Sequence, residues 1–217
     1  MEAINISRKY LRELQSLRLS NVSSGEGSIL RNPLNGKEVL KILHQQNGLY
    51  LSNKLYTLNS LYDIEDALDN DSFVLPNRLL TVDDKVVGFT MPLINGVTLA
   101  DILFNADIDI KIKVKYLKRI GAILDAMASF RKEYPQSNWY LNDLHERNFM
   151  VDLDSDKMYA VDLDSCRIFG NHPFLSKYLS SFSPIINHPE KYHSNFCISC
   201  GGDFVADENA DLYSYAM

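Results

Sequence analysis

Several features that would place a chain outside the ordinary globular class are scarce here. Only 3 of the 217 residues are cysteine, which disfavours a disulfide-stapled secreted domain and fits a reducing compartment. No apolar run approaches the ~20 residues that a membrane span needs. The start, Met1–Asn5, also lacks the basic and then apolar profile of a signal peptide. We therefore expect a cytoplasmic protein with no membrane partner.

Positive charge is also in short supply. The chain carries 22 basic and 28 acidic residues, a net charge of −6, and gives no reason to expect nucleic-acid binding. The basic residues gather mainly at Lys111–Lys115 and Lys118–Arg119, a pattern that favours the solvated face of a helix. With 46% hydrophobic and 23% charged residues, the composition is that of a globular protein.

One pair of cysteines has metal-like spacing. Cys197-Ile-Ser-Cys200 is a lone CxxC, with only His188 and His193 nearby. A structural zinc site needs about four ligands. Ordinary loop thiols are therefore the favoured interpretation, and metal or redox use is the alternative.

The hydrophobic pattern predicts strands in the first half of the chain and mainly helices in the second. The length of the chain suits one large domain or two small lobes that share a cleft. The predicted elements are a helix over 1–18, strands on either side of a glycine turn at 23–28, a strand over 38–43, a helix over 50–68, strands over 73–80 and 85–91, helices over 98–104 and 109–134, strands over 149–151 and 158–161, and a helix from 211.

The most informative residues form two polar motifs separated by apolar strands. Tyr140-Leu-Asn-Asp-Leu-His-Glu-Arg-Asn148 is followed by Val161-Asp-Leu-Asp-Ser165. In such an order, one Asp accepts the proton of an attacking hydroxyl, while the Asn and the later Asp hold magnesium against phosphates. The alternative is that Asp143 and Asn148 are ordinary turn residues, because Asp and Asn are common turn formers.

This order resembles the protein-kinase-like superfamily over nearly the whole chain, and a branch of bacterial Ser/Thr kinase-like proteins in particular. Aminoglycoside-phosphotransferase-type enzymes share the Asp-Leu-His-x-x-Asn shape of residues 143–148. The resemblance implies an α+β, two-lobed fold. Its parts would be a small antiparallel-sheet N-lobe over 1–91, a hinge over 92–97 and a helical, shortened C-lobe over 98–217.

The resemblance also assigns roles for ATP and Mg²⁺. Lys41 matches the strand lysine that contacts the phosphates, and an edge-strand lysine pointing to water is the alternative. Asp143 matches the catalytic Asp, and His145 stands in the same loop as a further catalytic residue. Asn148 and Asp162 match the metal ligands. The remaining nucleotide contacts would come from Gly25, Gly27, Ile29, Met91 and Leu93.

Five departures from the family pattern stand out. Leu141 replaces the family His. His145 replaces the family Lys, and because the ordinary pKa of an imidazole lies near physiological pH, any role of His145 there would depend on pH. Asp164 stands where the family has Gly, as a second metal ligand or a structural acid. Glu65 is the only Glu in the predicted helix over 50–68, yet it lies further from Lys41 than the family norm. Gly25 and Gly27 fit an ordinary hairpin turn as well as a thinned phosphate loop.

The last quarter of the chain resembles the end of an activation segment and the start of a larger C-lobe. His188-Pro-Glu190 resembles the end of an activation segment. Asp211 resembles the Asp at the start of the larger helical part of the C-lobe. Candidate phosphosites upstream are Ser176, Ser180, Ser181 and Ser183. Because further family helices are absent, we expect either that the chain is a fragment of a longer protein or that a homodimer contact or a partner chain covers the exposed face.

Three functions follow from the resemblance. The first is a Ser/Thr protein kinase that transfers the γ-phosphate of ATP to a protein hydroxyl. The second is a nucleotide-binding pseudokinase or regulatory module, which the thin glycine loop and the uncertain partner of Lys41 favour. The third is a small-molecule kinase of the aminoglycoside-phosphotransferase type.

Overall fold

The structure is a computed structural model that describes residues 1–19, 27–44, 46, 48–68, 72–137, 139–141 and 143–168. The chain divides into two compact units. The first unit comprises Met1–Asp66 and Val74–Leu93, and the second comprises Ala67–Phe73 and Ile94–Met217.

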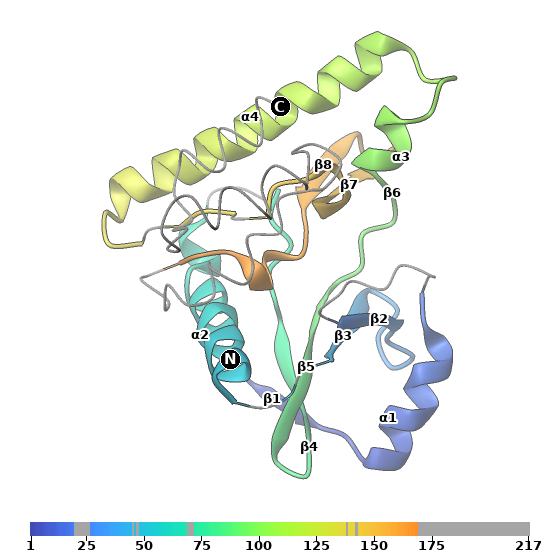
Figure 1. The fold of residues 1–217 in the computed structure, drawn as a ribbon, viewed down its shortest axis with the longest axis vertical. Coiled ribbons are helices and arrows are strands. Elements are labelled where there is room, and N and C mark those ends of the chain that lie inside the picture. The colour runs from blue at the N-terminus through green and yellow to red at the C-terminus, as the bar shows by residue number, and fades with distance from the viewer. Residues whose placement is uncertain are drawn as a thin grey trace, which may run out of the picture. The chain divides into compact units, whose positions relative to one another are not determined.

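The first unit is built on a five-stranded sheet with the order β1-β4-β5-β3-β2 (Figure 1). All its neighbouring strands are antiparallel except β1 and β4, which are parallel. The strands are β1 (Ala3–Asn5), β2 (Gly27–Arg31), β3 (Glu38–Leu43), β4 (Arg78–Val82) and β5 (Lys85–Pro92). β3 has the bounds that its apolar run predicts, and every one of its residues is buried.

Two helices and two 3₁₀ turns complete the first unit. They are α1 (Arg8–Leu14), η1 (Gln15–Leu17), α2 (Gly48–Asp63) and η2 (Glu65–Ala67). Leu14 of α1 packs into a core cluster with Leu30, Leu40 and Leu80 of the sheet. Leu58 of α2 belongs to a second cluster with Leu43 and Phe89. The sheet therefore contributes buried side chains to both clusters.

The predicted helix over residues 1–18 is wrong at its start. Ala3–Asn5 form β1, in register with Leu79–Thr81 of β4, and helix begins only at Arg8. The Ile6 N–H donates to the Thr81 carbonyl at 2.8 Å, which continues the pairing beyond the strand. Ile4 and Ile6 have the two-residue spacing of one strand face, whereas the helical spacing that led to the prediction begins only at Ile6.

Two further boundaries differ from the sequence prediction. The strand predicted over 73–80 is in fact an isolated bridge from Phe73 to Ala160, followed by β4 from Arg78. The helix predicted over 50–68 ends at Asp63, and Glu65 falls in the separate turn η2. Glu65 is therefore not a residue of α2.

Helices α3 (Leu99–Leu103) and α4 (Ile110–Glu133) of the second unit start as their caps predict. The Thr98 hydroxyl accepts from the Asp101 N–H, and the Asp101 carboxylate accepts from the Thr98 N–H, which is a reciprocal capping box. Asp109 caps α4 by accepting from the Lys111 N–H at 2.7 Å. Pro135 follows the end of α4, where its ring disfavours further helix.

A small antiparallel sheet completes the second unit. Its strands are β6 (Val97–Thr98), β7 (Phe149–Asp152) and β8 (Lys157–Ala160), in the order β6-β7-β8 (Figure 1). Gly96 lies so close to this sheet that an added Cβ would stand 2.1 Å from the Val151 carbonyl oxygen. A side chain at position 96 would therefore separate β6 from β7.

Asp156, in the predicted turn between β7 and β8, ties the hairpin to α4. It has a left-handed φ of 55°. Its carboxylate accepts from Lys115 Nζ at 2.5 Å, Tyr116 Oη at 2.9 Å and Arg119 Nη2 at 2.9 Å. These hydrogen bonds hold the pKa of Asp156 well below its ordinary value.

The fold is thus α+β, as the sequence predicts. In the part of the chain that the structure describes, no helix is both long and apolar enough to cross a membrane. The predictions at 170–217 lie outside the described residues. They concern the serines of the activation-like segment, His188-Pro-Glu190, Cys197, Cys200 and the helix from Asp211.

Candidate functional site

Two neighbouring loops of the second unit carry the polar motifs. The first runs from α4 to β7, and the second follows β8. Tyr140 and Arg167 exchange two backbone hydrogen bonds of 2.9 Å between these loops. At the other end, the Val161 N–H donates to the Asn148 carbonyl at 2.9 Å. The loops are therefore fastened together on both sides of the candidate residues.

An aromatic cluster anchors the start of the first loop. Trp139 is fully buried, and its ring contacts Phe73 and Phe130 at centroid distances of 4.7 and 5.5 Å. Arg131 of α4 donates from Nη1 to the Trp139 carbonyl at 2.9 Å, and its guanidinium lies 4.6 Å from the centre of the Tyr140 ring. Sequence reasoning did not find this anchor, because it depends on side chains brought together by folding.

Asp143 and Asn148 are bonded directly to each other. Asn148 Nδ2 donates to the Asp143 backbone carbonyl at 2.9 Å and to Asp143 Oδ2 at 3.0 Å. Asp143 Oδ1 is shielded from water and has no hydrogen-bond partner among the residues that the structure describes. No hydrogen bond between described residues uses Asn148 Oδ1. One oxygen on each residue therefore has unused capacity to accept a proton or bind a cation.

His145 faces Asp143 from the same loop. Its Nδ1 accepts from the Arg147 N–H at 3.1 Å, so the neutral ring carries its proton on Nε2. Nε2 lies 3.5 Å from Asp143 Oδ2. Burial opposes the charged ring, but Asp143, with the nearby charges of Glu146 and Asp162, raises the pKa of His145 above its ordinary 6.5. These carboxylates therefore favour protonation of the ring, which would replace the contact between Nδ1 and the Arg147 N–H.

Glu146 is the feature of this loop that the sequence did not reveal. The residue is 2% exposed, and in the described part of the chain neither carboxylate oxygen has a hydrogen-bond partner. An unpaired buried carboxylate is costly. It adds negative charge next to His145 and helps to raise the pKa of that ring. Its position between His145 and Arg147 in a polar loop gave no sign of burial.

Asp162 stands at the junction between β8 and the turn η4 (Leu163–Ser165). Its backbone is left-handed, with φ 62° and ψ 35°, and its side chain does not cap η4. Such strained positions are enriched at functional sites. Asp164 is 3% exposed within η4. Its enclosure favours the structural role over that of a second metal ligand.

Lys41, Gly27 and Ile29 come together in the first unit. Lys41 lies in β3 opposite Ile29 of β2, and it is fully buried. It is therefore not the edge-strand lysine pointing to water. An added Cβ on Gly27 would lie 3.2 Å from Lys41 Cγ and 3.3 Å from Lys41 Cε. Gly27 thus makes room for the lysine stem. Gly25 lies outside the described residues.

The predicted adenine-binding segment is already engaged in backbone pairing. Met91 is paired with Val39 in the β3–β5 ladder. The Leu93 N–H donates to the Lys37 carbonyl at 2.8 Å. The Leu93 N–H would have to leave this partner to donate to a nucleotide base.

The described residues contain no ready-made cluster of three or more His, Cys, Asp or Glu side chains for a metal ion. Magnesium in phosphotransferases uses only one or two protein carboxylates, with water and phosphate oxygens as the other ligands. Asn148, with its unused Oδ1, and Asp162 in the neighbouring loop are chemically suitable for that role. The donor set therefore fits a magnesium that arrives with a nucleotide.

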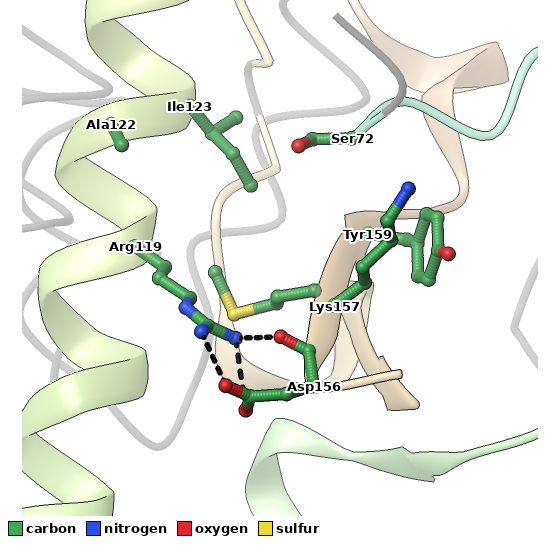
Figure 2. Close-up of a pocket in the computed structure, with 8 residues that line it drawn as sticks. Ser72, Arg119, Ala122, Ile123, Asp156, Lys157 and Tyr159 are labelled. Carbon is green, nitrogen blue, oxygen red and sulfur yellow. Dashed lines mark hydrogen bonds and ion pairs between the residues drawn. The ribbon is translucent and has the colours of Figure 1, made fainter. Parts of the chain in front are cut away.

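A separate pocket of about 250 Å³ lies between α4 and β8 in the second unit (Figure 2). Figure 2 shows the Arg119 guanidinium turned toward Asp156 rather than toward the pocket interior. The charge of Arg119 is neutralised by that contact. None of the predicted catalytic, nucleotide-binding or metal-binding residues lines this pocket.

No protein-family model matches the chain, and no curated protein matches it significantly. The assignment of function therefore rests on the residues and their geometry.

Proposed function

We propose that this chain is an ATP- and Mg²⁺-dependent phosphotransferase with a two-lobed protein-kinase-like fold, acting as a Ser/Thr protein kinase. The observation that carries the proposal is the bonded pair Asp143–Asn148 on a loop fastened to the loop of Asp162. A general base, an amide oxygen and a metal-binding carboxylate are what transfer to a hydroxyl requires. Mg-ATP would supply the phosphoryl group.

Each residue has a distinct task in this proposal. Asn148 and His145 hold Oδ2 of Asp143, and Oδ1 is left as the acceptor for the proton of the incoming hydroxyl. Asn148 Oδ1 and the Asp162 carboxylate are the metal ligands. Lys41 binds phosphate oxygens from its buried position in β3. Positioning and charge stabilisation supply most of the acceleration.

A nucleotide-binding pseudokinase is the second candidate, and α2 favours it. The protein-kinase resemblance calls for a helix glutamate opposite Lys41. The fully buried charged residue of α2 is instead a lysine, Lys54. The acid within α2, Asp63, is exposed, and Glu65 is exposed outside the helix. A second buried lysine would bind phosphates but would not orient Lys41 as a carboxylate does.

The test is a thermal-shift titration with ATP, with and without Mg²⁺, together with measurement of ADP release. A bound nucleotide must raise the unfolding midpoint. Asp162→Asn should remove the Mg-dependent part of the shift, and Asp143→Asn should stop ADP release while binding persists. Asp154→Asn, a change in the exposed β7–β8 turn, is the matched control.

The outcomes separate the candidates. A Mg-dependent shift with ADP release supports the phosphotransferase, and comparison of protein with small-molecule hydroxyl acceptors then identifies the substrate class. A shift without turnover supports the pseudokinase. No shift with ATP at any Mg²⁺ concentration overturns both.

A further inference from the structure

The N-terminal half of α4 exposes an apolar stripe that nothing in the proposed function uses. Ile110 is 68% exposed, Val114 is 40% exposed and Leu117 is 39% exposed. Spacings of four and three residues place these side chains on one side of the helix, over about 10 Å of its length. The core-facing residues of α4, such as Tyr116, Ile120 and Ile123, lie on another side.

Lysines border this stripe on both sides. Counting about 100° per residue, Lys113 falls on one flank, and Lys111 and Lys118 fall on the other. Lys115 and Arg119 of the same helix are committed to Asp156. Lys111, Lys113 and Lys118 form no ion pair with any described residue. The sequence from Ile110 to Leu124 contains no acidic residue, although the whole chain has a net charge of −6.

The spacing is that of the seam of a coiled coil. Ile110 and Leu117 take d positions and Val114 takes the a position between them. In the same register, Lys111 and Lys118 take e positions and Lys113 takes g. Apolar residues at a and d pack against a second helix, and residues at e and g select that helix by charge.

We infer that this face of α4, defined by Ile110, Val114, Leu117 and the lysines beside them, docks an amphipathic helix of a partner protein that carries acidic residues at its own e and g positions. Lys111, Lys113 and Lys118 would then pair with carboxylates while the apolar stripe is covered.

The same charges argue against a second copy of this helix. In a parallel pair, Lys113 of one copy would face Lys118 of the other, and in an antiparallel pair like positions would face each other. Either arrangement places ammonium groups side by side. Self-association through this face is therefore disfavoured.

A membrane surface is also a poor match. Exposed Asp107 and Asp109 immediately precede Ile110 in the chain. A planar anionic surface that met Ile110 and the lysines would also meet these carboxylates and be repelled. A single helix can lie over Lys111–Lys118 and leave the end of α4 uncovered.

The test uses two fluorescein-labelled synthetic peptides of about three heptads. Both have Leu and Ile at a and d. One has Glu at e and g, and the other has Lys at the same positions. In fluorescence anisotropy at low salt, the Glu peptide should bind the whole chain at least ~10-fold more tightly than the Lys peptide, and high salt should reduce this preference.

Two variants locate the binding. Lys113→Glu with Lys118→Glu should reverse the preference between the peptides, and Lys37→Glu with Lys85→Glu, the same charge change at exposed positions of the first unit, should not. Val114→Ser should weaken Glu-peptide binding several-fold without changing the unfolding midpoint, because Val114 is half exposed.

Three results would overturn the inference. They are equal binding of the two peptides, Glu-peptide binding that survives Val114→Ser, and a dimer in sedimentation velocity that Val114→Ser dissociates. Binding to phosphatidylcholine–phosphatidylserine vesicles that Lys113→Glu with Lys118→Glu removes would overturn it too, in favour of a lipid surface.

Discussion

Asn148 holds Asp143 by two hydrogen bonds from a single amide nitrogen, one to the backbone carbonyl at 2.9 Å and one to Oδ2 at 3.0 Å. This contact closes the loop across five residues and fixes both the path of its backbone and the rotation of the Asp143 carboxylate. The loop is therefore preorganised by its own residues.

Replacing Asn148 with Ala should destabilise the second unit. Asp143 would lose both contacts, and net contributions of about 0.5–1.5 kcal/mol for each hydrogen bond predict a loss of about 1–3 kcal/mol in unfolding free energy. The measurement is urea denaturation followed by the fluorescence of the one tryptophan, Trp139, which lies buried at the start of this loop.

Exposed Asn95 provides the control, since Asn95→Ala removes the same side chain outside the two loops. A loss below about 0.5 kcal/mol for Asn148→Ala, within the range of ordinary surface changes, would contradict the bracing role.

His145 makes the stability of the loop depend on pH. Because its pKa is raised in the folded state, its contribution is complete below the unfolded value of 6.5 and disappears as pH rises through the folded value. The unfolding free energy of the wild type should therefore exceed that of His145→Gln by more at pH 6 than at pH 9.

Titration of the His145 ring by NMR checks the cause directly. The midpoint should lie above 6.5, and Asp143→Asn should lower it by removing the largest favourable contact. A wild-type midpoint at or below 6.5 would show that burial outweighs the surrounding carboxylates.

The elements that the sequence predicted well have their causes close together in the chain. β3 follows from a largely apolar run, Val39–Leu43, that only Lys41 interrupts, and α3 follows from the reciprocal cap between Thr98 and Asp101. The strand β1 was missed because its partner, Leu79–Thr81, is more than seventy residues away. Two residues with strand spacing, Ile4 and Ile6, were too few to separate this segment from the helical pattern that follows it.

The same distinction applies to the candidate site. The order of Asp143, Asn148 and Asp162 was readable as a motif, and the backbone pairing of the two loops agrees with it. The burial of Glu146 and of Lys54 could not be predicted, because charged side chains are expected at the surface unless tertiary packing encloses them.

Glu38 is expected to stabilise the first unit at neutral pH. Its carboxylate accepts from Asn32 Nδ2 at 3.1 Å, Asn77 Nδ2 at 2.9 Å and Arg78 Nη2 at 2.9 Å. Burial raises its pKa, but Asn77, Arg78 and Asn35 together lower it below the ordinary 4.5. Its stabilisation is therefore complete above pH 4.5 and is lost as pH falls through the folded pKa.

Glu38→Gln should thus lower the unfolding midpoint at pH 7, and the difference from wild type should shrink toward pH 3. Far-UV circular dichroism with heating measures the unfolding midpoints of wild type and variant at pH 7 and at pH 3. Glu2→Gln, at an exposed position, is the control. A difference that is the same at pH 7 and pH 3 would mean that the hydrogen-bond geometry matters and the charge does not.

A substitution at Lys41 can separate the contribution of this residue to the fold from its proposed role in nucleotide binding. Lys41 is fully buried in β3, with its ammonium 5.9 Å from the centre of the Phe89 ring. Methionine has a similar unbranched stem and no charge, so Lys41→Met keeps the apolar packing of the stem and removes the ammonium. If Lys41 binds phosphate oxygens, the same change should remove most of the ATP-dependent shift in the unfolding midpoint.

Gly27→Ala tests the same site through its neighbour. The new methyl would meet the Ile42 carbonyl oxygen at 2.8 Å and the Lys41 stem at 3.2 Å, so the lysine must move. We expect a lower midpoint and a smaller ATP-dependent shift, while Lys37→Met, at an exposed position, should change neither. An undiminished ATP-dependent shift in Lys41→Met would show that the buried ammonium serves the fold alone, and the nucleotide would then have to be held by other residues.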